Sequence, residues 1–315
     1  MWTFREERQQ FYLHQYLVQQ PDLNYRNPQL KEHMFDIIKF WMDLGVDGFR
    51  FDAVTKLVED DRWLDEPSAD DPNVTDPGDW LYYDHIYTND LPETREILKE
   101  FYTLVKEYNL QTRNEERVVM LEAWLDINST MEYYKCGDFP FNFGFVNMDQ
   151  APNAEQTASL ISEWLSHIPD GKITNWVLGN HDRKRIGTRL GGLQYIDVFN
   201  TISLTLPGIS VTYYGEEIGM VDEYISYEDT QDPWGCNCGP EHYQDCSRDP
   251  SRTPMQWSNS TNAGFSSANS TWLPVNPNFH EINVENESFQ DFGYWFNYQK
   301  LLELRQTKEV LKRKL

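Results

Sequence analysis

Residues 45–54 read GVDGFRFDAV, and this stretch decides how the rest of the chain is interpreted. Phe49 and Phe51 alternate with Arg50 and Asp52, which is the period-two pattern of a β-strand with one aromatic and one charged face. A cation two residues away favours the ionised form of Asp52. Such a carboxylate at the end of an apolar strand can be a nucleophile, a metal ligand or half of a structural ion pair. Taken alone, the stretch favours the ion pair.

The composition argues against a nucleic-acid partner and is compatible with a sugar-binding surface. With 315 residues, 39% of them hydrophobic, the chain can bury a large core in one or two domains. Aromatic residues make up 15%, which suits a surface that stacks on sugar rings, although a large packed core uses the same residues. The net charge of -24 argues against nucleic acid, because phosphate binding depends on Lys and Arg.

The glycosylation pattern N-x-[ST] points to the secretory pathway. No apolar run is long enough to span a bilayer, and no charged and then apolar signal segment opens the chain. The pattern occurs five times, and together these matches favour a secreted, extracellular or luminal protein. The acceptors are Asn73, Asn128, Asn259, Asn269 and Asn286.

The four cysteines favour a disulfide over a metal site. Cys236, Cys238 and Cys246 lie close together in one loop and Cys136 stands apart. An even number permits disulfides, and four cysteines allow three pairings, which the sequence leaves open. A zinc site would need two CxxC-like knuckles or paired histidines, and neither is present.

Strand and helix patterns alternate along most of the chain. A helix is predicted from Pro28, capped by Asn27 and stopped by Gly45, with an apolar stripe of Met34, Ile37, Ile38 and Trp41. Further helices are predicted from about 92 to 105, over 157–165 and over 194–205. Near-continuous apolar strands are predicted at 46–52, 118–121, 139–143, 174–178 and 209–213, which is typical of a buried parallel sheet. Residues 221–288 are predicted to be a long loop excursion, and a helix at about 289–306 precedes a solvated Lys/Arg-rich tail.

Three carboxylates occupy equivalent places in this pattern. Asp52, Glu122 and Asp182 each come at the carboxyl end of a different predicted strand, and in a β/α barrel those ends form the rim that carries the active site. Carboxylates that converge must separate in pKa. Glu122, between Leu121, Ala123 and Trp124, is expected to keep its proton longer than the carboxylate beside a guanidinium. An ionised nucleophile and a protonated acid are what retaining glycoside hydrolysis requires.

Six motifs give the chain a family resemblance. It resembles the catalytic barrel of the α-amylase superfamily of glycoside hydrolases, in its maltase (α-glucosidase) branch of invertebrate type. The motifs appear in the family's order and cover most of the chain. They are QPDLN at 20–24, GFRFD at 48–52, LEAW at 121–124, GNHD at 179–182, GISVTYYGEEIG at 208–219 and RTPMQW at 252–257.

The resemblance implies a role for each carboxylate. Asp52 matches the nucleophile that forms a covalent glucosyl-enzyme, with Arg50 positioning it. Glu122 matches the acid that protonates the leaving oxygen and then activates water. Asp182 matches the carboxylate that holds sugar hydroxyls and favours the distorted, oxocarbenium-like ring, and His181 matches a hydroxyl-binding residue of the same subsite.

Other residues and ligands follow from the same resemblance. Arg185 and Arg252 match further sugar contacts, and Glu216 and Glu217 are expected to tune the rim. The small Ala53 after the nucleophile resembles the α-1,4 (maltose, sucrose) pattern. The resemblance implies a small oligosaccharide substrate and no required cofactor. Relatives often bind calcium, and the acidic loops at 59–79 and 221–232 suit either a calcium ion or a solvated surface.

The resemblance covers part of the family's domain organisation. The fold class is therefore α/β, a (β/α)8 TIM barrel of which about the last five strands are found. Residues 1–26 match the end of the loop-rich domain before the fourth strand unit, and 27–315 match the C-terminal portion of the barrel with its Cys-containing excursion. The N-terminal strands and the C-terminal β-sandwich have no match. We expect the isolated 315 residues to be inactive or poorly folded, because a five-strand arc leaves sheet edges unpaired.

A second interpretation comes from another class of protein. Heavy-chain subunits of amino-acid transporters are similar to maltases in fold and share TPMQW-like and TWLP-like stretches, here at 253–257 and 271–274. They are membrane-anchored chaperones, and an anchor would lie outside this chain. Erosion of the catalytic set distinguishes them, whereas the set at 180–182, Asp52 and Glu122 is intact here. This favours an enzyme. A sugar-binding lectin has only the aromatic content in its favour.

Overall fold

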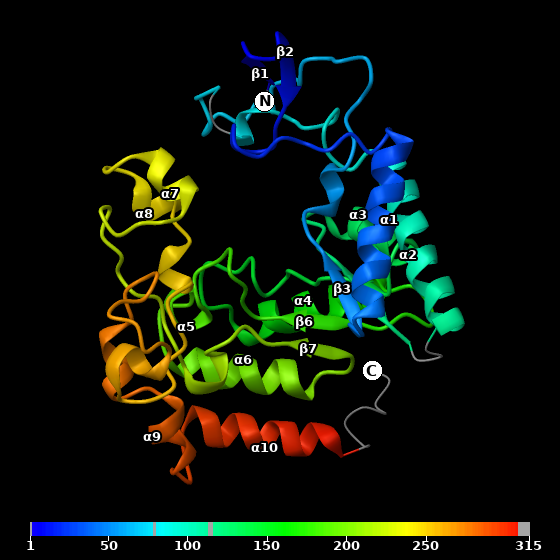
Figure 1. Ribbon diagram of the computed structural model, residues 1–315. Coiled ribbons are helices and arrows are strands. Elements are labelled where there is room, and N and C mark those ends of the chain that lie inside the picture. Colours follow the sequence, from blue (N-terminus) through cyan, green and yellow to red (C-terminus); the bar gives the residue numbers. More distant parts are fainter. Residues whose placement is uncertain (1, 78–79, 113–115, 308–315) are drawn as a thin grey trace. The chain divides into compact units, whose positions relative to one another are not determined.

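The computed structural model describes residues 2–77, 80–112 and 116–307 (Figure 1). The chain divides into two compact units. The first comprises Met1–Phe141 and Pro169–Lys172, and the second comprises Asn142–Ile168 and Ile173–Leu315. Each unit is described by itself.

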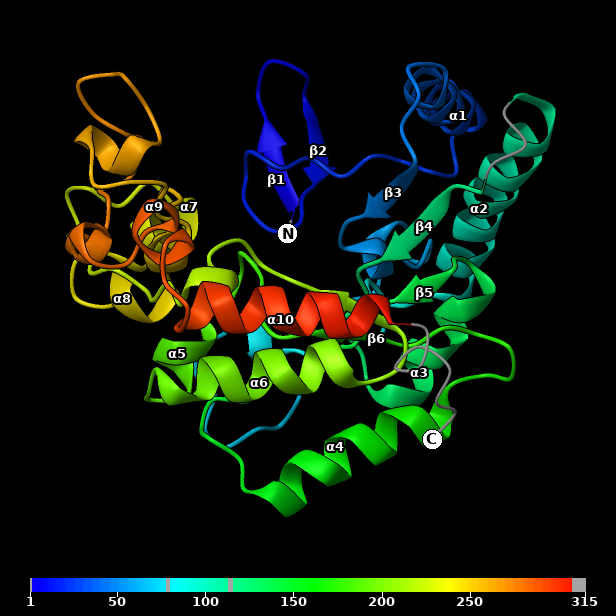
Figure 2. The ribbon, with the colours of Figure 1, turned by 90° about the horizontal axis from the view of Figure 1, so that it is seen from below.

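The first unit contains a hairpin and a parallel sheet. Strands β1 and β2 pair antiparallel, and β3, β4 and β5 form a parallel sheet in that order, visible in Figure 2 with α2 beside it. The strands predicted at 46–52 and 118–121 are confirmed, whereas the one predicted at 139–143 pairs over two residues only. The elements are β1 (Trp2–Arg5), β2 (Gln10–Leu13), α1 (Pro28–Asp43), β3 (Gly48–Phe51), α2 (Pro92–Thr112), β4 (Val118–Leu121), α3 (Ile127–Glu132) and β5 (Phe139–Pro140).

Helix α1 begins where its capping residues predict. The side chain of Asn27 accepts a hydrogen bond from the backbone amide of Gln29 at 2.9 Å, and Pro28 occupies the first turn, where its missing amide proton costs nothing. The helix ends before Gly45, which has a φ of 94° that favours glycine. The cap and the stop therefore fix the element that leads into β3.

The buried face of α1 differs from the predicted stripe. Ile38 and Met42 are buried in the core, with Met34 packed against them, and these residues are four apart. The prediction that Ile37 and Trp41 share this face is wrong, since both are exposed. The helix packs against α2 through a face one residue further along, which leaves the tryptophan in solvent.

One apolar cluster holds the first unit together. It joins α1 and α2 to the face of β4 that carries Val119 and Leu121, so that the strands that end near residues 52 and 122 rest on a packed core. Its buried members are Ile38, Met42, Val54, Val58, Ile97, Leu98, Phe101, Val105, Val119, Leu121, Ala123, Tyr133 and Cys136.

The second unit contains two parallel strands and a layer of helices. Strands β6 and β7 pair in parallel, and α10 lies along α6 in both ribbon views (Figures 1 and 2). Arg305 of α10 donates hydrogen bonds to the carbonyls of Leu204 and Leu206 at 2.8 and 3.1 Å, which holds the end of α6. The elements are α4 (Ala154–His167), β6 (Asn175–Val177), α5 (Ile186–Arg189), α6 (Gln194–Thr205), β7 (Ile209–Val211), α7 (Pro233–Cys238), α8 (Tyr243–Cys246), α9 (Val284–Ser288) and α10 (Tyr294–Gln306).

Two expectations for the C-terminal part need correction. The excursion at 221–288 contains the short helices α7, α8 and α9 and is not a plain loop. The last helix begins at Tyr294, later than predicted, because Gly293 before it has a φ of 106°. The Lys/Arg-rich tail at 308–315 lies outside the described residues. No helix that the structure describes is long and apolar enough to cross a membrane.

A disulfide joins Cys238 and Cys246, a pairing that the sequence left open. It links α7 to α8 within the excursion. The two remaining candidates are free thiols: Cys136 is buried, where its Sγ donates to the carbonyl of Arg95 at 3.3 Å, and Cys236 is exposed. Packing into the core of the first unit explains why Cys136 takes no part in a disulfide.

Candidate active site

The parallel pairing of β3 and β4 brings Asp52 and Glu122 together. Phe51 is in register with Leu121, and the backbone amide of Glu122 donates to the carbonyl of Phe51 at 3.0 Å, so the ladder continues one residue past the strands. Two carboxyl groups thus leave adjacent strand ends side by side. The structure thus brings these two predicted site residues together within the first unit.

Arg50 joins the two carboxyl groups. Its Nη1 lies 2.6 Å from Oδ1 of Asp52, and its Nη2 lies 2.9 Å from Oε2 of Glu122. The two partners differ in environment: the side chain of Asp52 is 69% exposed and that of Glu122 is 6% exposed. One guanidinium therefore orients an accessible carboxylate and a buried carboxyl group at the same time.

Glu122 has a fixed orientation. Its Oε2 accepts a hydrogen bond from the backbone amide of Ala53 at 3.1 Å, and its Oε1 accepts one from the indole Nε1 of Trp124 at 3.0 Å. Burial and the hydrogen bond with Asp52 raise the pKa of Glu122, while Trp124, Ala53 and Arg50 act in the opposite direction. The direction is the one predicted from the apolar neighbours of Glu122 in the sequence.

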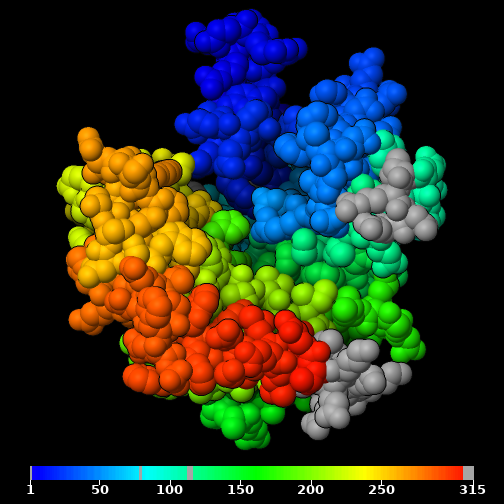
Figure 3. All heavy atoms as spheres, turned by 60° about the horizontal axis from the view of Figure 1, so that its bottom comes forward, coloured from blue at the N-terminus to red at the C-terminus, as the bar shows by residue number. Residues whose placement is uncertain are grey.

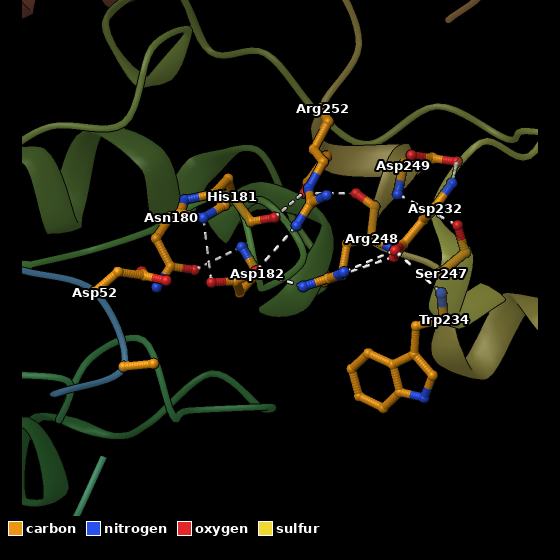
Figure 4. A network of polar contacts seen from close by, with 12 residues as sticks. Asp52, Asn180, His181, Asp182, Asp232, Trp234, Ser247, Arg248, Asp249 and Arg252 are labelled. Carbon is orange, nitrogen blue, oxygen red and sulfur yellow. Dashed lines mark hydrogen bonds and ion pairs between the residues drawn. The ribbon is translucent and has the colours of Figure 1, made fainter. Parts of the chain in front are cut away.

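Asp182 lies in the second unit, in the loop after β6 (Figure 4). Its backbone amide donates to Oδ1 of Asn180 at 3.0 Å, which tightens the loop. Its own Oδ1 accepts from Arg248 Nη1 at 3.0 Å and from Arg252 Nη2 at 2.9 Å. Nε2 of His181 is 3.4 Å from Oδ2. Two guanidinium groups and a histidine thus surround this carboxylate.

Arg252 contacts the loop in two ways. Besides Asp182, it donates from Nε to the carbonyl of His181 at 2.6 Å. It therefore connects the RTPMQW motif to the GNHD motif, which are about 70 residues apart in the sequence. The structure brings together Arg252, His181 and Asp182, as the sequence predicts, and leaves the histidine ring half-exposed to solvent.

Sequence reasoning missed Arg248 and its partner Asp232. Arg248 donates from Nε to Oδ2 of Asp232 at 2.8 Å and from Nη2 to Oδ1 at 2.7 Å (Figure 4). The carboxylate of Asp232 is 0% exposed, so the expectation that the acidic loop at 221–232 is a solvated surface is wrong for this residue. Burial acts to raise the pKa of Asp232, but hydrogen bonds from Arg248 outweigh it and lower that pKa. The only sequence signal was an arginine four residues before Arg252.

Arg185 is not placed to contact a sugar. It is 2% exposed, and its guanidinium carbon lies 4.9 Å and 4.6 Å from the ring centroids of Tyr213 and Tyr214. Its Nη1 donates to the carbonyl of Tyr214 at 2.6 Å. The prediction of a substrate contact is therefore wrong, because two aromatic rings hold this side chain in the interior.

Glu216 and Glu217 are more buried than a rim position requires. Glu216 is buried, and its Oε2 accepts from the backbone amide of Tyr213 at 3.0 Å. Burial raises the pKa of Glu216 to about 8 and also raises that of Glu217. Oε1 of Glu216 would lie 2.6 Å from a Cβ added at Gly179, so the carboxyl group supports the backbone just before the Asn180–Asp182 loop.

The structure offers little for a metal ion. Over residues 2–77, 80–112 and 116–307, no three His, Cys, Asp or Glu side chains gather as a metal site. The possible calcium ion stays a prediction. So does the placing of the Asp52–Glu122 pair opposite Asp182, since the two groups belong to different units.

Two carboxyl groups on adjacent strand ends of a parallel α/β sheet are characteristic of glycoside hydrolases that use an acid and a nucleophile. The sequence matches the family model for the α-amylase catalytic domain over residues 1–314. The chain therefore belongs to the α-amylase family of glycoside hydrolases, whose fold is a TIM barrel. The predictions of the family, a family of glycoside hydrolases, and of the fold class are confirmed.

Particular relatives narrow the branch. The chain is 43% identical over 318 residues to Maltase 1 of Drosophila virilis, covering 98% of this chain and 49% of that protein. It is 43% identical over 293 residues to a salivary alpha-glucosidase of Anopheles gambiae, covering 90% and 50%. A solved structure of the alpha-glucosyl transfer enzyme XgtA is 27% identical with a TM-score of 0.87, covering 99% of this chain and 59% of that one. The chain spans about half the length of the curated relatives it matches.

The alternative class is also among the relatives. A human amino acid transporter heavy chain is 36% identical over 321 residues, covering 99% of this chain and 44% of that protein. Its identity is lower than that of the insect maltase and the salivary alpha-glucosidase. The comparisons thus favour an enzyme over a transporter subunit.

Proposed function

We propose that the full-length protein is a retaining α-glucosidase that releases terminal, non-reducing α-linked glucose from maltose, sucrose or short oligosaccharides. The observation that carries the proposal is the pair bridged by Arg50. Asp52 is open to solvent beside the guanidinium, as a nucleophile must be, and Glu122 is buried with a raised pKa, as a general acid must be.

The proposed reaction has two steps. In the first, Asp52 attacks the anomeric carbon while Glu122 gives its proton to the leaving oxygen, which breaks the glycosidic bond and forms a glucosyl ester. In the second, Glu122 takes a proton from water, which attacks the same carbon and releases glucose with retained configuration. Asp182, His181 and Arg252 would bind the hydroxyl groups of the glucose ring.

A pocket next to Asp182 is consistent with an oligosaccharide substrate. It is lined by Asp182, Arg248 and Trp234, among others, and the tryptophan is exposed at its edge. The Arg248 guanidinium carbon lies 5.7 Å from the centroid of the Trp234 ring, so the ring is held in place. An indole face beside fixed polar groups suits the stacking of a further sugar unit.

Secretion is part of the proposal. One relative is named a salivary alpha-glucosidase, and four of the five acceptor asparagines of the N-x-[ST] pattern are exposed. The exposed acceptors are Asn73, Asn128, Asn259 and Asn269. The competing function, a catalytically silent heavy-chain subunit of an amino-acid transporter, is supported by the relative of that name.

The test uses the full-length protein secreted from insect cells. Parent, Asp52→Asn and Glu122→Gln would be assayed for glucose release from maltose and sucrose, with Asp36→Asn, an exposed residue of α1, as the matched control. We expect each site variant to lose at least about a thousandfold in kcat and the control to be unchanged. Proton NMR should show the α-anomer of glucose first. A folded parent without turnover, or equal rates for all four proteins, would favour the transporter-subunit function.

A further inference from the structure

Asn269 stands out among the five acceptor asparagines because of its surroundings. It lies in an exposed loop of the second unit, followed by Ser270 and Thr271, and its side chain makes no hydrogen bond to any residue that the structure describes. The loop itself is ordered by Asn262, whose Nδ2 donates to the carbonyls of Ser266 and Ala268 at 3.2 and 2.7 Å. The acceptor nitrogen is therefore presented to solvent on a fixed backbone.

A pocket opens beside this asparagine. Asn269 and Trp272 both line it, together with Gln231 and Asp229. The stretch 262–279, which contributes most of the lining, lies in the orange part of the surface in Figure 3. The side chain of Trp272 is 63% exposed, and its indole N–H donates no hydrogen bond within the described part of the chain. Exposure alone is not distinctive, since Trp63 and Trp234 are also exposed, but Trp272 lines a pocket together with a glycosylation acceptor and with amide and carboxylate groups. Such a setting suits a partner with one apolar face and several polar edges.

We propose that Asn269 carries an N-linked glycan whose first N-acetylglucosamine packs on Trp272 in this pocket. The co-reactant is a lipid-linked oligosaccharide diphosphate of the secretory pathway. The bond between the sugar C1 and the diphosphate oxygen breaks, a bond between C1 and Nδ2 of Asn269 forms, the amide loses one proton, and the lipid diphosphate leaves. The apolar face of the sugar then covers the indole, and its hydroxyl and acetamido groups face Gln231 and Asp229.

Asn286 offers an internal contrast. It lies half-buried in α9, and its Nδ2 already donates to the carbonyls of His280 and Glu281 at 3.1 and 3.4 Å. A glycan at this nitrogen would remove one of the two protons that these hydrogen bonds use. The structure therefore assigns Asn269 as occupied and Asn286 as unoccupied.

The first measurement is site occupancy in the full-length protein secreted from insect cells. Intact glycopeptide mass spectrometry should find a glycan on Asn269 and none on Asn286, and Asn269→Gln should lose one glycan mass. Asn128→Gln, which removes an exposed acceptor in the first turn of α3, is the matched control and should leave the glycan on Asn269 in place. An unmodified Asn269 would overturn the proposal outright.

The second measurement tests the contact with Trp272. Melting temperatures would be compared for parent and Trp272→Ala, each before and after removal of glycans by peptide-N-glycosidase. We expect Trp272→Ala to lower the melting temperature of the glycosylated protein by about 2 °C and to have no effect in the Asn269→Gln background. Phe289→Ala, which removes an exposed ring that does not line the pocket, should shift both forms equally.

The outcomes separate the proposal from its alternatives. An effect of Trp272→Ala that is the same with and without the glycan would show that the ring packs on protein, and would overturn the contact. Trp272→Phe, which keeps an aromatic face, should retain most of the stabilisation and guards against a folding defect in the alanine variant. No step depends on turnover, so the result is independent of whether the protein is an α-glucosidase.

Discussion

Replacing Glu216 by glutamine should remove a large part of the pH dependence of stability. This carboxyl group is 4% exposed, and its Oε1 has no hydrogen-bond partner within the described residues. Its other oxygen accepts only the backbone amide of Tyr213. Burial raises the pKa of Glu216 to about 8, and the positive charges of Arg185 and Arg189 lower it by less than burial raises it. The group is therefore neutral in the folded protein at pH 7.

The magnitude is set by the two pKa values. In the unfolded chain Glu216 ionises above its ordinary value of 4.5, whereas in the folded protein it keeps its proton until about pH 8. Between these values the unfolded state binds fewer protons, so the free energy of unfolding falls as the pH rises. At 1.36 kcal/mol per unit, the loss between pH 4.5 and pH 8 amounts to about 5 kcal/mol. Above pH 8 both states are ionised and the loss is complete.

Two further buried acids contribute to the fall in the free energy of unfolding in the lower part of the interval between pH 4.5 and pH 8. Burial also raises the pKa of Asp222 to about 6 and that of Glu287 to about 7. Both groups therefore lower the free energy of unfolding as the pH rises, but the contribution of Asp222 ends at about pH 6 and that of Glu287 at about pH 7. Between pH 7 and pH 8 Asp222 and Glu287 no longer contribute, and the comparison of Glu216→Gln with the parent separates the slope due to Glu216 from any due to Glu217, whose pKa burial also raises.

The assay is urea unfolding of the full-length protein at pH 5, 7 and 8.5. Glutamine can accept the same amide hydrogen bond through its Oε1 and cannot ionise, so Glu216→Gln should gain several kcal/mol over the parent between pH 5 and pH 8.5. Glu241→Gln, at an exposed position, is the matched control and should follow the parent. If the difference between Glu216→Gln and the parent is the same at all three pH values, the assignment of a neutral buried acid is refuted.

Three further substitutions test the packing around the site. Gly48→Ala should destabilise the protein by about 1–3 kcal/mol, because the new Cβ would lie 2.4 Å from the backbone oxygen of Val118, and thermal unfolding measures the loss. Asp232→Asn should cost about 2 kcal/mol in urea unfolding and lower activity, since it weakens the ion pair that holds Arg248 against Asp182. Arg117→Met should cost about 3 kcal/mol, because Arg117 is 3% exposed and donates to two backbone carbonyls, and an unchanged urea midpoint would contradict this.

The sequence predicts those parts of the fold that depend on local chemistry. The cap at Asn27, the helix over 194–205 and the strands at 46–52 and 118–121 are set by residues next to one another, and the structure confirms them. The face that a helix buries is less local. Trp41 lies in solvent because the position of α2 selects the neighbouring stripe of α1, and a single helix's pattern does not contain that information.

In the site too, features set by neighbouring residues could be predicted and features set by distant residues could not. Asp52 and Glu122 could be predicted because each comes directly after a strand, and parallel strands end at one edge of their sheet. The contact between Arg248 and Asp182 joins residues 66 apart, and the buried Asp232 pairs with the same Arg248 across 16 residues. Arg185 was predicted to contact the sugar because it follows the GNHD motif closely, but its side chain packs on tyrosines that come almost 30 residues later. Where a side chain ends depends on such distant partners.

The contrast between the two carboxyl groups arises from the backbone immediately after each strand. After β3 the chain turns at Ala53, whose φ of 44° is left-handed, and this turn leaves Asp52 in solvent while its amide points at Glu122. After β4 the carbonyl of Glu122 accepts from the amide of Val54, and Trp124 bonds its carboxyl group. A β-branched residue at position 53 would suit an ordinary strand but would be strained in this left-handed turn. The local backbone therefore exposes the carboxyl group of Asp52 to water and buries that of Glu122, while Arg50 binds both.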